Sequence, residues 1–285
     1  MKSVCFFASY FTGNNLPYYI TVYLKELKKH FSEVVLLTSQ KELSQQSRQF
    51  LTAETIQLLT EDNDGFDFGM WYKAFKKFDV ASYDKITLVN DSCVLFKPLD
   101  EFISWAKANT ADIQGMTLSE AVAPHIQSYF LVLNKKAVLL TTEYFEKNGI
   151  LRNISDVIRT YEIGLSTHLL SKGLTMAAFV DNNGYKGEFS PYYQCIKYHL
   201  SKGIPVIKKK ILFTSYRRDE QFTLARMNFN IDPEYYIHLI KEQKKNTIID
   251  FDRLRSDKTD SMDAASKIKY AFNRRFIKLV RSFRK

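Results

Sequence analysis

Hydrophobic positions along the first two thirds of the chain follow two alternating periods. Compact apolar runs suit buried strands, and apolar residues spaced three or four apart, such as Ile20, Leu24 and Leu27, suit amphipathic helices. The compact runs predict strands over residues 4–9, 33–38, 56–60, 86–89, 112–117 and 128–133. The wider spacing predicts helices over residues 16–31, 69–78, 99–108, 136–147 and 155–171.

This order of elements predicts an α/β fold, because strands that alternate with helices form a mostly parallel sheet flanked by helices. The pattern weakens beyond Val180, and a charged stretch rich in Ser and Asp follows at 250–266. We therefore expect one domain over residues 1–249, a linker over 250–266 and a separate helix over 267–285.

Composition narrows the class of protein without naming it. A chain of 285 residues that is 45% hydrophobic can bury a full core. Its three cysteines are widely spaced and form no CxxC pair, which favours a reducing cytoplasm. No apolar run approaches the roughly 20 residues of a membrane span, so we expect a soluble or peripheral protein.

The loop after the first expected strand excludes several nucleotide-binding classes. Residues 9–15 contain a single glycine, Gly13. The loop therefore lacks the GxGxxG turn of dinucleotide-binding proteins and the GxxxxGK[ST] loop of P-loop enzymes. It also lacks the Gly- and Arg-rich loop expected of a sugar-nucleotide pyrophosphorylase. Dehydrogenases, kinases and nucleotidyltransferases are disfavoured.

A lone carboxylate, Asp91, follows the expected strand over residues 86–89, between Asn90 and Ser92. The end of a central strand is where α/β enzymes place their chemistry. Oxygen ligands at this point could hold a divalent cation that bridges a diphosphate. The same three residue types favour turns, so a simple strand end is the alternative.

Several blocks together resemble the rhamnan synthesis protein F family over roughly residues 4–213. They are Asn63 to Trp71, Tyr83-Asp84-Lys85, Asn90-Asp91-Ser92, His125 to Phe130 and Tyr161 to Ser166. The resemblance implies a GT-A glycosyltransferase that builds bacterial cell-surface polysaccharide from a nucleoside diphosphate sugar. It leaves the sugar open, and rhamnose from dTDP-rhamnose is the first hypothesis.

In GT-A enzymes a DxD-type motif holds a metal ion and the donor diphosphate, and residues 90–92 occupy that place. The resemblance makes Asn90, Asp91 and Ser92 donor-binding residues, with Asp91 as the ligand of Mn²⁺ or Mg²⁺. Only one of the usual two carboxylates is present. A cation such as Lys208 or Lys209 is therefore the alternative means of neutralising the leaving diphosphate.

Glu162 is the candidate general base. Its block resembles the acidic helix motif of inverting GT-A enzymes, in which a carboxylate takes the proton of the attacking sugar hydroxyl. An exposed helical carboxylate is the alternative. For Asn63 and Asp67 we weigh a helix N-cap against contacts to the donor, where Asp67 would bind ribose or sugar hydroxyls. Tyr10 is expected against the base.

Three further polar residues receive weaker expectations. His125 and Gln127 precede a strand and are expected on the acceptor side. For His125, ordinary structural hydrogen bonding is the alternative. His199 precedes a segment that resembles the C-terminal loop closing over the diphosphate, so it is a weak candidate metal ligand. Trp71 is expected to pack in the core.

The last nineteen residues form a basic amphipathic pattern. Between Lys267 and Lys285 there are eight Lys or Arg residues and no acidic one, against a net charge of +10 for the chain. On a helix the apolar residues form one stripe, Ile268, Phe272, Phe276, Leu279, Val280 and Phe283. The pattern predicts a helix lying on an anionic membrane, and a helix docked on protein is the alternative.

Taken together, the residues predict an inverting glycosyltransferase on the cytoplasmic face of the membrane, with a glycan or lipid-linked glycan as acceptor. Two other classes stay open. A non-catalytic GT-A-like assembly subunit would bind nucleotide or sugar without cleaving the donor. A nucleic-acid-binding protein is suggested by the isoelectric point near 9.3, but the charge is concentrated in the tail, so we expect no nucleic-acid partner.

Overall fold

The computed structural model describes residues 2–120, 122–181 and 196–209. Within these residues, eight strands form one mixed sheet in the order β3-β2-β1-β4-β8-β6-β7, with β9 paired to β6. Its strands are β1 (Ser3–Ser9), β2 (Glu33–Thr38), β3 (Gln57–Thr60), β4 (Lys85–Asn90), β6 (Ile113–Ser119), β7 (His125–Ile126), β8 (Phe130–Asn134) and β9 (Met176–Val180). Strands β1 to β4 are mutually parallel, whereas β8 runs antiparallel to both β4 and β6. The predicted α/β sheet is confirmed.

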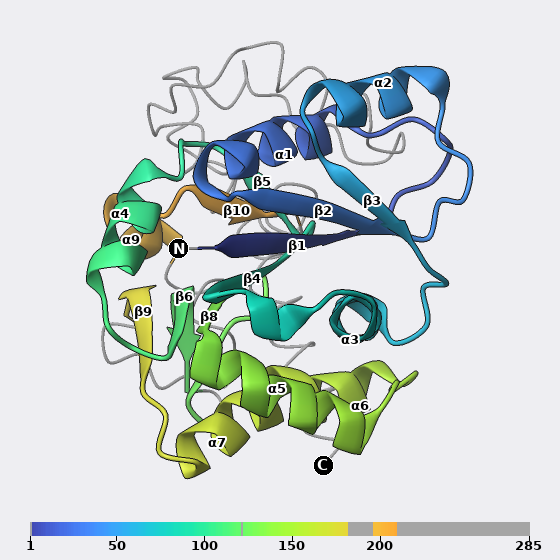
Figure 1. Cartoon of the computed structure of the whole chain (residues 1–285). Helices are drawn as coiled ribbons and strands as arrows, with labels where there is room; N and C mark the ends of the chain where they lie inside the picture. Colours follow the sequence, from blue (N-terminus) through green and yellow to red (C-terminus); the bar gives the residue numbers. More distant parts are fainter. Residues whose placement is uncertain (1, 121, 182–195, 210–285) are drawn as a thin grey trace, which may run out of the picture.

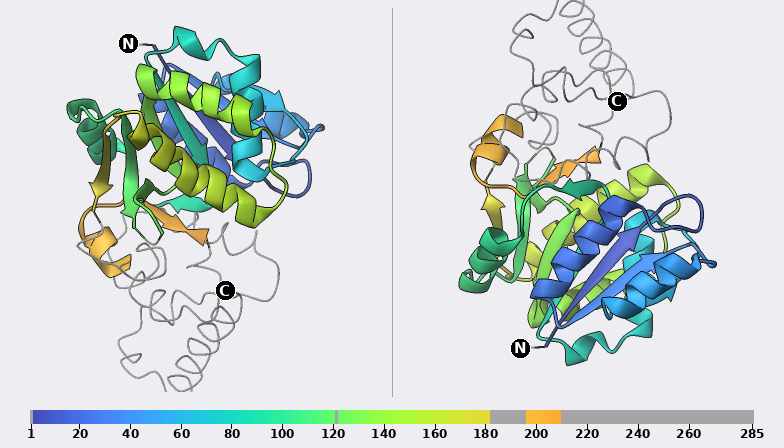
Figure 2. Two further views of the ribbon diagram at one scale, coloured as in Figure 1. Left: turned by 90° about the horizontal axis from the view of Figure 1, so that it is seen from below. Right: turned by 90° about the horizontal axis from the view of Figure 1, so that it is seen from above.

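Helices cover both faces of this sheet (Figure 1). They are α1 (Tyr18–His30), α2 (Gln45–Ala53), α3 (Phe66–Lys77), α4 (Asp100–Ala108), α5 (Lys135–Asn148), α6 (Ile154–Val157), α7 (Gly164–Ser171) and α9 (Ile196–Ser201). Short helical segments η1 (Val80–Ser82) and η2 (Ile158–Ile163) complete the list. Helices α1 and α2 lie on one face, and α3, α5 and α7 lie on the other, as the views in Figure 2 also show.

Strand β1 shows why two helical layers are needed. Its side chains alternate between faces, so Cys5 and Phe7 join the core beneath α1, whereas Val4, Phe6 and Ala8 join the core beneath α3 and α5. All five are buried. A strand with two apolar faces is stable only when both are covered, and this places β1 at the centre of the sheet.

Two predicted helices need correction, and one helix of the sheet layers was not predicted. The helix expected at Gly69 begins at Phe66, and the predictions missed α2 altogether. The helix expected over 155–171 is interrupted, because η2 is a π-helix between α6 and α7. Gly164 permits this wider turn: its backbone N–H donates to the carbonyl of Arg159, five residues earlier, and a Cβ there would lie 2.9 Å from that oxygen.

A second, two-stranded sheet returns the end of the described chain to the main sheet. Strand β10 (Val206–Lys208) pairs antiparallel with β5 (Cys93–Leu95). One residue further, the backbone N–H of Lys209 donates to the carbonyl of Ser92 over 2.8 Å. Each helix that the structure describes is too short or too polar to cross a lipid bilayer. The expected linker and tail, residues 250–285, lie outside the described residues.

Candidate functional site

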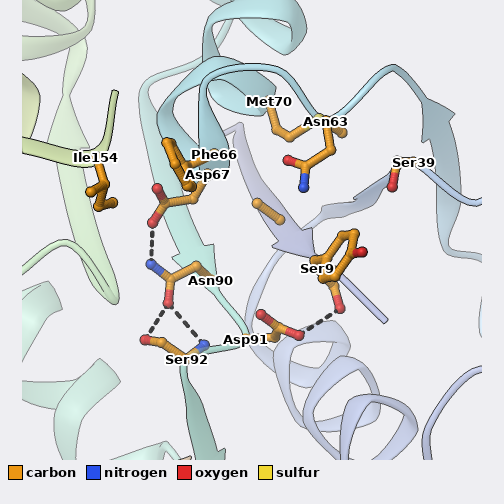
Figure 3. A pocket seen from close by; sticks show the side chains of 12 residues that line it. Ser9, Ser39, Asn63, Phe66, Asp67, Met70, Asn90, Asp91, Ser92 and Ile154 are labelled. Carbon is orange, nitrogen blue, oxygen red and sulfur yellow. Dashed lines mark hydrogen bonds between the residues drawn. The ribbon is translucent and has the colours of Figure 1, made fainter. Parts of the chain in front are cut away.

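A cavity of about 410 Å³ opens at the carboxyl ends of β1 and β4. The two strands are parallel neighbours, and their register places Ala8 beside Asn90, so the loops that follow them meet at this edge. Figure 3 shows the cavity. Its lining residues are Ala8, Ser9, Tyr10, Ser39, Asn63, Phe66, Asp67, Met70, Asn90, Asp91, Ser92 and Ile154. Six of the seven residues predicted to bind the donor therefore lie together.

Asp91 is held by donors from three distant parts of the chain. Its Oδ2 accepts hydrogen bonds from Ser9 Oγ over 3.0 Å, Tyr19 Oη over 3.1 Å and Lys209 Nζ over 3.2 Å. The Asp91 side chain is 14% exposed and that of Lys209 is 25% exposed. The negative charge of Asp91 is thus balanced by an ammonium that solvent still reaches.

Asn90 links Asp67 to the strand end. Its Nδ2 donates to Asp67 Oδ2 over 2.5 Å, and its Oδ1 accepts from the backbone N–H and the Oγ of Ser92, over 3.1 and 2.6 Å (Figure 3). The three residues therefore fix one another. The amide of Asn90 suits this arrangement, since its nitrogen donates on one side while its oxygen accepts on the other.

Asp67 lies in an acidic environment. Burial and the charge of the nearby Glu162 carboxylate raise the pKa of Asp67 to about 6, although Asn90 and the backbone N–H of Phe68 donate to it. The residues next to these carboxylates bring them together: the rings of Phe68 and Tyr161 stack with centroids 5.2 Å apart. Glu162, on η2, thus lies close to the wall of the cavity that Asp67 forms.

The alternative role of Asn63 and Asp67 as helix caps is wrong. The N-cap of α3 is Gly65, at φ +89°, and no side chain caps the helix. Asp67 sits in the first turn, where its Oδ1 accepts from the backbone N–H of the next residue, Phe68. Phe66 has φ +57°, an unfavourable conformation for a bulky residue, and its exposed ring lines the cavity. The backbone is therefore bent here in a way that presents side chains to the cavity.

His125 and Gln127 are buried and do not line this cavity. His125 Nδ1 lies 2.8 Å from the carbonyl of Ala123, and Gln127 Oε1 accepts from Thr117 Oγ1 over 3.2 Å. These contacts match the structural alternative stated for His125. However, β7 packs against η2, so their segment adjoins the one that carries Glu162. An acceptor-side role stays a prediction.

Lys208, Lys209 and His199 lie outside the set of lining residues. Lys208 Nζ is 5.4 Å from the centre of the Tyr129 ring, whereas the neighbouring Lys209 reaches Asp91. His199 is buried on α9. Of the two lysines considered from sequence, Lys209 is thus the one that contacts the predicted diphosphate site.

Two oxygen atoms that a divalent cation would use near Asp91 already accept hydrogen bonds. Oδ2 of Asp91 already accepts three hydrogen bonds, one of them from an ammonium, and Oδ1 of Asn90 accepts two. In the described part of the chain, one group of three or more His, Cys, Asp and Glu side chains is close enough to share a metal, and it consists of Glu26, His30 and Asp100. That group includes neither Asp91 nor His199.

Sequence reasoning missed several residues of the site. Ser9 and Tyr19 buttress Asp91, and Phe66, Met70 and Ile154 give the cavity an apolar wall. Ser9 could have been found, because it ends the strand beside β4. Tyr19 lies on the amphipathic helix α1, where its sequence pattern indicates only core packing. Ile154 joins the wall through the packing of α6, which no sequence motif indicates.

The family comparison now has a structural context. The model of the rhamnan synthesis protein F family matches residues 35–270, most of the chain. The chain therefore belongs to the rhamnan synthesis protein F family, as its motifs predicted, and it is a nucleotide-sugar glycosyltransferase. The comparison with curated protein sequences gave no match.

Solved structures show distant likeness. The glycosyltransferase GlyE of Streptococcus pneumoniae is 12% identical, with 89% of this chain and 62% of GlyE covered and a TM-score of 0.43. TarS of S. aureus is 12% identical, with 85% of this chain and 79% of the TarS chain covered and a TM-score of 0.40. A glucose-1-phosphate thymidylyltransferase from Bacillus anthracis, described as putative, is 10% identical, with 62% of this chain and 86% of that protein covered and a TM-score of 0.41. The family model carries the assignment, not these structures.

Proposed function

We propose that the chain transfers a sugar from a nucleoside diphosphate donor to a growing bacterial polysaccharide, with inversion at the anomeric carbon. The observation that supports this most is the convergence of Tyr10, Asn63, Asp67 and residues 90–92 on one cavity. Polar side chains at the carboxyl ends of parallel strands are the usual arrangement for nucleotide ligands in open α/β sheets. The family name favours rhamnose, from a dTDP donor, as the sugar.

In the proposed reaction, the Glu162 carboxylate accepts the proton of an acceptor hydroxyl while that oxygen attacks the anomeric carbon. The bond from this carbon to the diphosphate oxygen breaks, and the diphosphate leaves with its electron pair. Asp67 supports the step by binding donor hydroxyls, and Tyr10, which is 60% exposed, provides an aromatic surface for the base. Attack from the face opposite the diphosphate inverts the configuration.

The acceptor and the location are further parts of the proposal. The basic amphipathic pattern over residues 267–285 favours binding to an anionic membrane, where a lipid-linked glycan would be the acceptor. Truncation after Asp260 should release the protein from anionic vesicles and preserve transfer to a short soluble acceptor. Retention of the truncated chain on vesicles would refute the membrane role of the tail.

A panel of nucleotide sugars tests the function directly. The full chain is incubated with each donor, and thermal stability and release of nucleoside diphosphate are measured. A true donor should raise the melting temperature, because a ligand that binds only the folded state stabilises it by mass action. Binding without release of diphosphate in the presence of glycan acceptors would favour the non-catalytic subunit instead.

A further inference from the structure

The cation nearest to the predicted diphosphate site is a side chain of the chain itself. Lys209 Nζ lies 3.2 Å from Asp91 Oδ2 and 3.0 Å from Tyr19 Oη. It also lies 4.9 Å from the centre of the Tyr19 ring, within the range of a cation–π contact. Two residues, Asp91 and Tyr19, thus hold this ammonium at the carboxyl end of β4.

Backbone hydrogen bonds also hold Lys209 in place. The pairing of β10 with β5 places Lys208 opposite Cys93, and the next backbone N–H, that of Lys209, donates to Ser92. Residues 208 and 209 are therefore held in register with residues 92 and 93. The side chain of Lys209 needs no long excursion to reach Asp91.

An ammonium has three hydrogens, and the structure records acceptors for two of them, on Tyr19 and Asp91. The Lys209 side chain keeps 25% of its surface exposed. A phosphate oxygen can accept the third hydrogen without disturbing the first two. A hydrogen bond from an ammonium to a phosphate is charge-assisted, and is stronger than one between neutral groups.

The acidic lining of the cavity favours such a cation. Its ionisable acidic residues are Asp67 and Asp91, and none of its lining residues is a Lys or Arg. A diphosphate would be repelled unless a positive charge balanced these carboxylates. A divalent cation would serve, but Oδ2 of Asp91 and Oδ1 of Asn90 already accept hydrogen bonds, as described above.

We infer that Lys209 binds the donor diphosphate and replaces a divalent metal at this site, with Asp91, Tyr19 and Ser9 as the residues that position its ammonium. The inference rests on the proposed function, because it concerns the same donor. It assigns to Asp91 a positioning role through hydrogen bonding, in place of metal ligation. Lys209 also stabilises the negative charge that develops as the diphosphate departs.

Calorimetric titration of the full chain with dTDP and UDP tests this inference without relying on turnover. Each titration is made after exhaustive treatment with chelator, and again with added Mg²⁺ or Mn²⁺. The wild type should bind one of the nucleotides without metal, with less than about a twofold change in Kd when metal is added. Lys209→Gln should weaken binding about 10- to 100-fold, the range expected for loss of a charged hydrogen bond.

Two variants guard against a merely structural effect. Lys209→Arg keeps the charge and should retain most of the affinity, and Lys202→Gln, an exposed lysine on the same C-terminal segment, should change nothing. Binding that appears only with Mg²⁺ or Mn²⁺, and that survives Lys209→Gln, would overturn the inference. If no nucleoside diphosphate or nucleotide sugar binds with or without metal, the proposed function itself fails.

Discussion

Asp67 and Asp91 line one cavity but have opposite electrostatic surroundings. Asp91 accepts from an ammonium and two hydroxyls, so its charge is balanced. Asp67 is half-buried near a second carboxylate, Glu162, and its pKa is raised to about 6. We therefore divide the site into two sides. On the cationic side, Lys209 and Asp91 face the leaving diphosphate, and on the acidic side, Asp67 and Glu162 serve proton transfer.

The strongest test of the acidic side is Glu162→Gln. The amide keeps the size of the side chain but cannot take a proton, so kcat should fall by a factor on the order of 10²–10⁴. Donor affinity, measured by calorimetry, should stay the same. Glu143→Gln, an exposed glutamate on α5, is the matched control and should leave both unchanged. Loss of donor affinity with kcat preserved would make Glu162 a binding residue.

On the cationic side, Asp91→Ala should weaken donor binding about 10- to 100-fold, because Lys209 loses the charged partner that positions it. The fold should survive, since Asp91 lies just beyond the end of β4. Nucleotide titration together with a thermal melt checks both points. Ser9→Ala removes one neutral hydrogen bond to the same oxygen and should have a much smaller effect. Wild-type affinity in Asp91→Ala would remove the distinction between the two sides.

The two sides differ in how far the sequence could predict them. Asp91 was found because an apolar strand ends in polar residues, a local pattern. The contact between Lys209 and Asp91 joins residues 118 positions apart and depends on the pairing of β10 with β5. Periodicity along the chain carries no information on such pairing, so the sequence could only offer Lys208 and Lys209 as equal candidates.

Local propensity also limited the fold prediction. Strands β1, β2 and β4 are buried on both faces and gave clear apolar runs. Helix α2, with the sequence QQSRQFLTA, is mostly polar and has few apolar positions to show a period. Its remaining signal was the cap, since Ser44 Oγ accepts from the backbone N–H of Ser47. The π-helix depends on contacts of Gly164 that only the folded chain makes.

Asp67→Asn sharpens the comparison through pH. The pKa of Asp67 rises from an ordinary value of 3.8 to about 6 on folding, so the folded state binds an extra proton between these values. Stability should therefore fall as pH rises from about 4 to about 6, and the variant should lack this slope. Melting temperatures across this range measure it. The control Asp62→Asn, at an exposed carboxylate, should keep the wild-type dependence of stability on pH. If Asp67→Asn also kept it, the pKa of Asp67 would not be raised.

The smallest expected effect concerns the π-helix that carries Glu162. A Cβ at Gly164 would lie 2.8 Å from Tyr144 Oη and 2.9 Å from the Arg159 carbonyl. Gly164→Ala should therefore destabilise the protein by about 1–3 kcal/mol, the usual cost of overpacking, and should lower kcat several-fold by shifting Glu162. Denaturant unfolding measures the first effect and steady-state kinetics the second.

Tyr144→Phe combined with Gly164→Ala separates the two contacts of this Cβ. Removal of the hydroxyl relieves one contact but loses its hydrogen bond to the Thr160 carbonyl, and the contact with Arg159 remains. The double variant should therefore recover only part of the stability lost in Gly164→Ala, which a double-mutant cycle will show as coupling between the two sites. If Gly164→Ala kept wild-type stability and kcat, the π-helix would not be needed to place Glu162 beside Asp67.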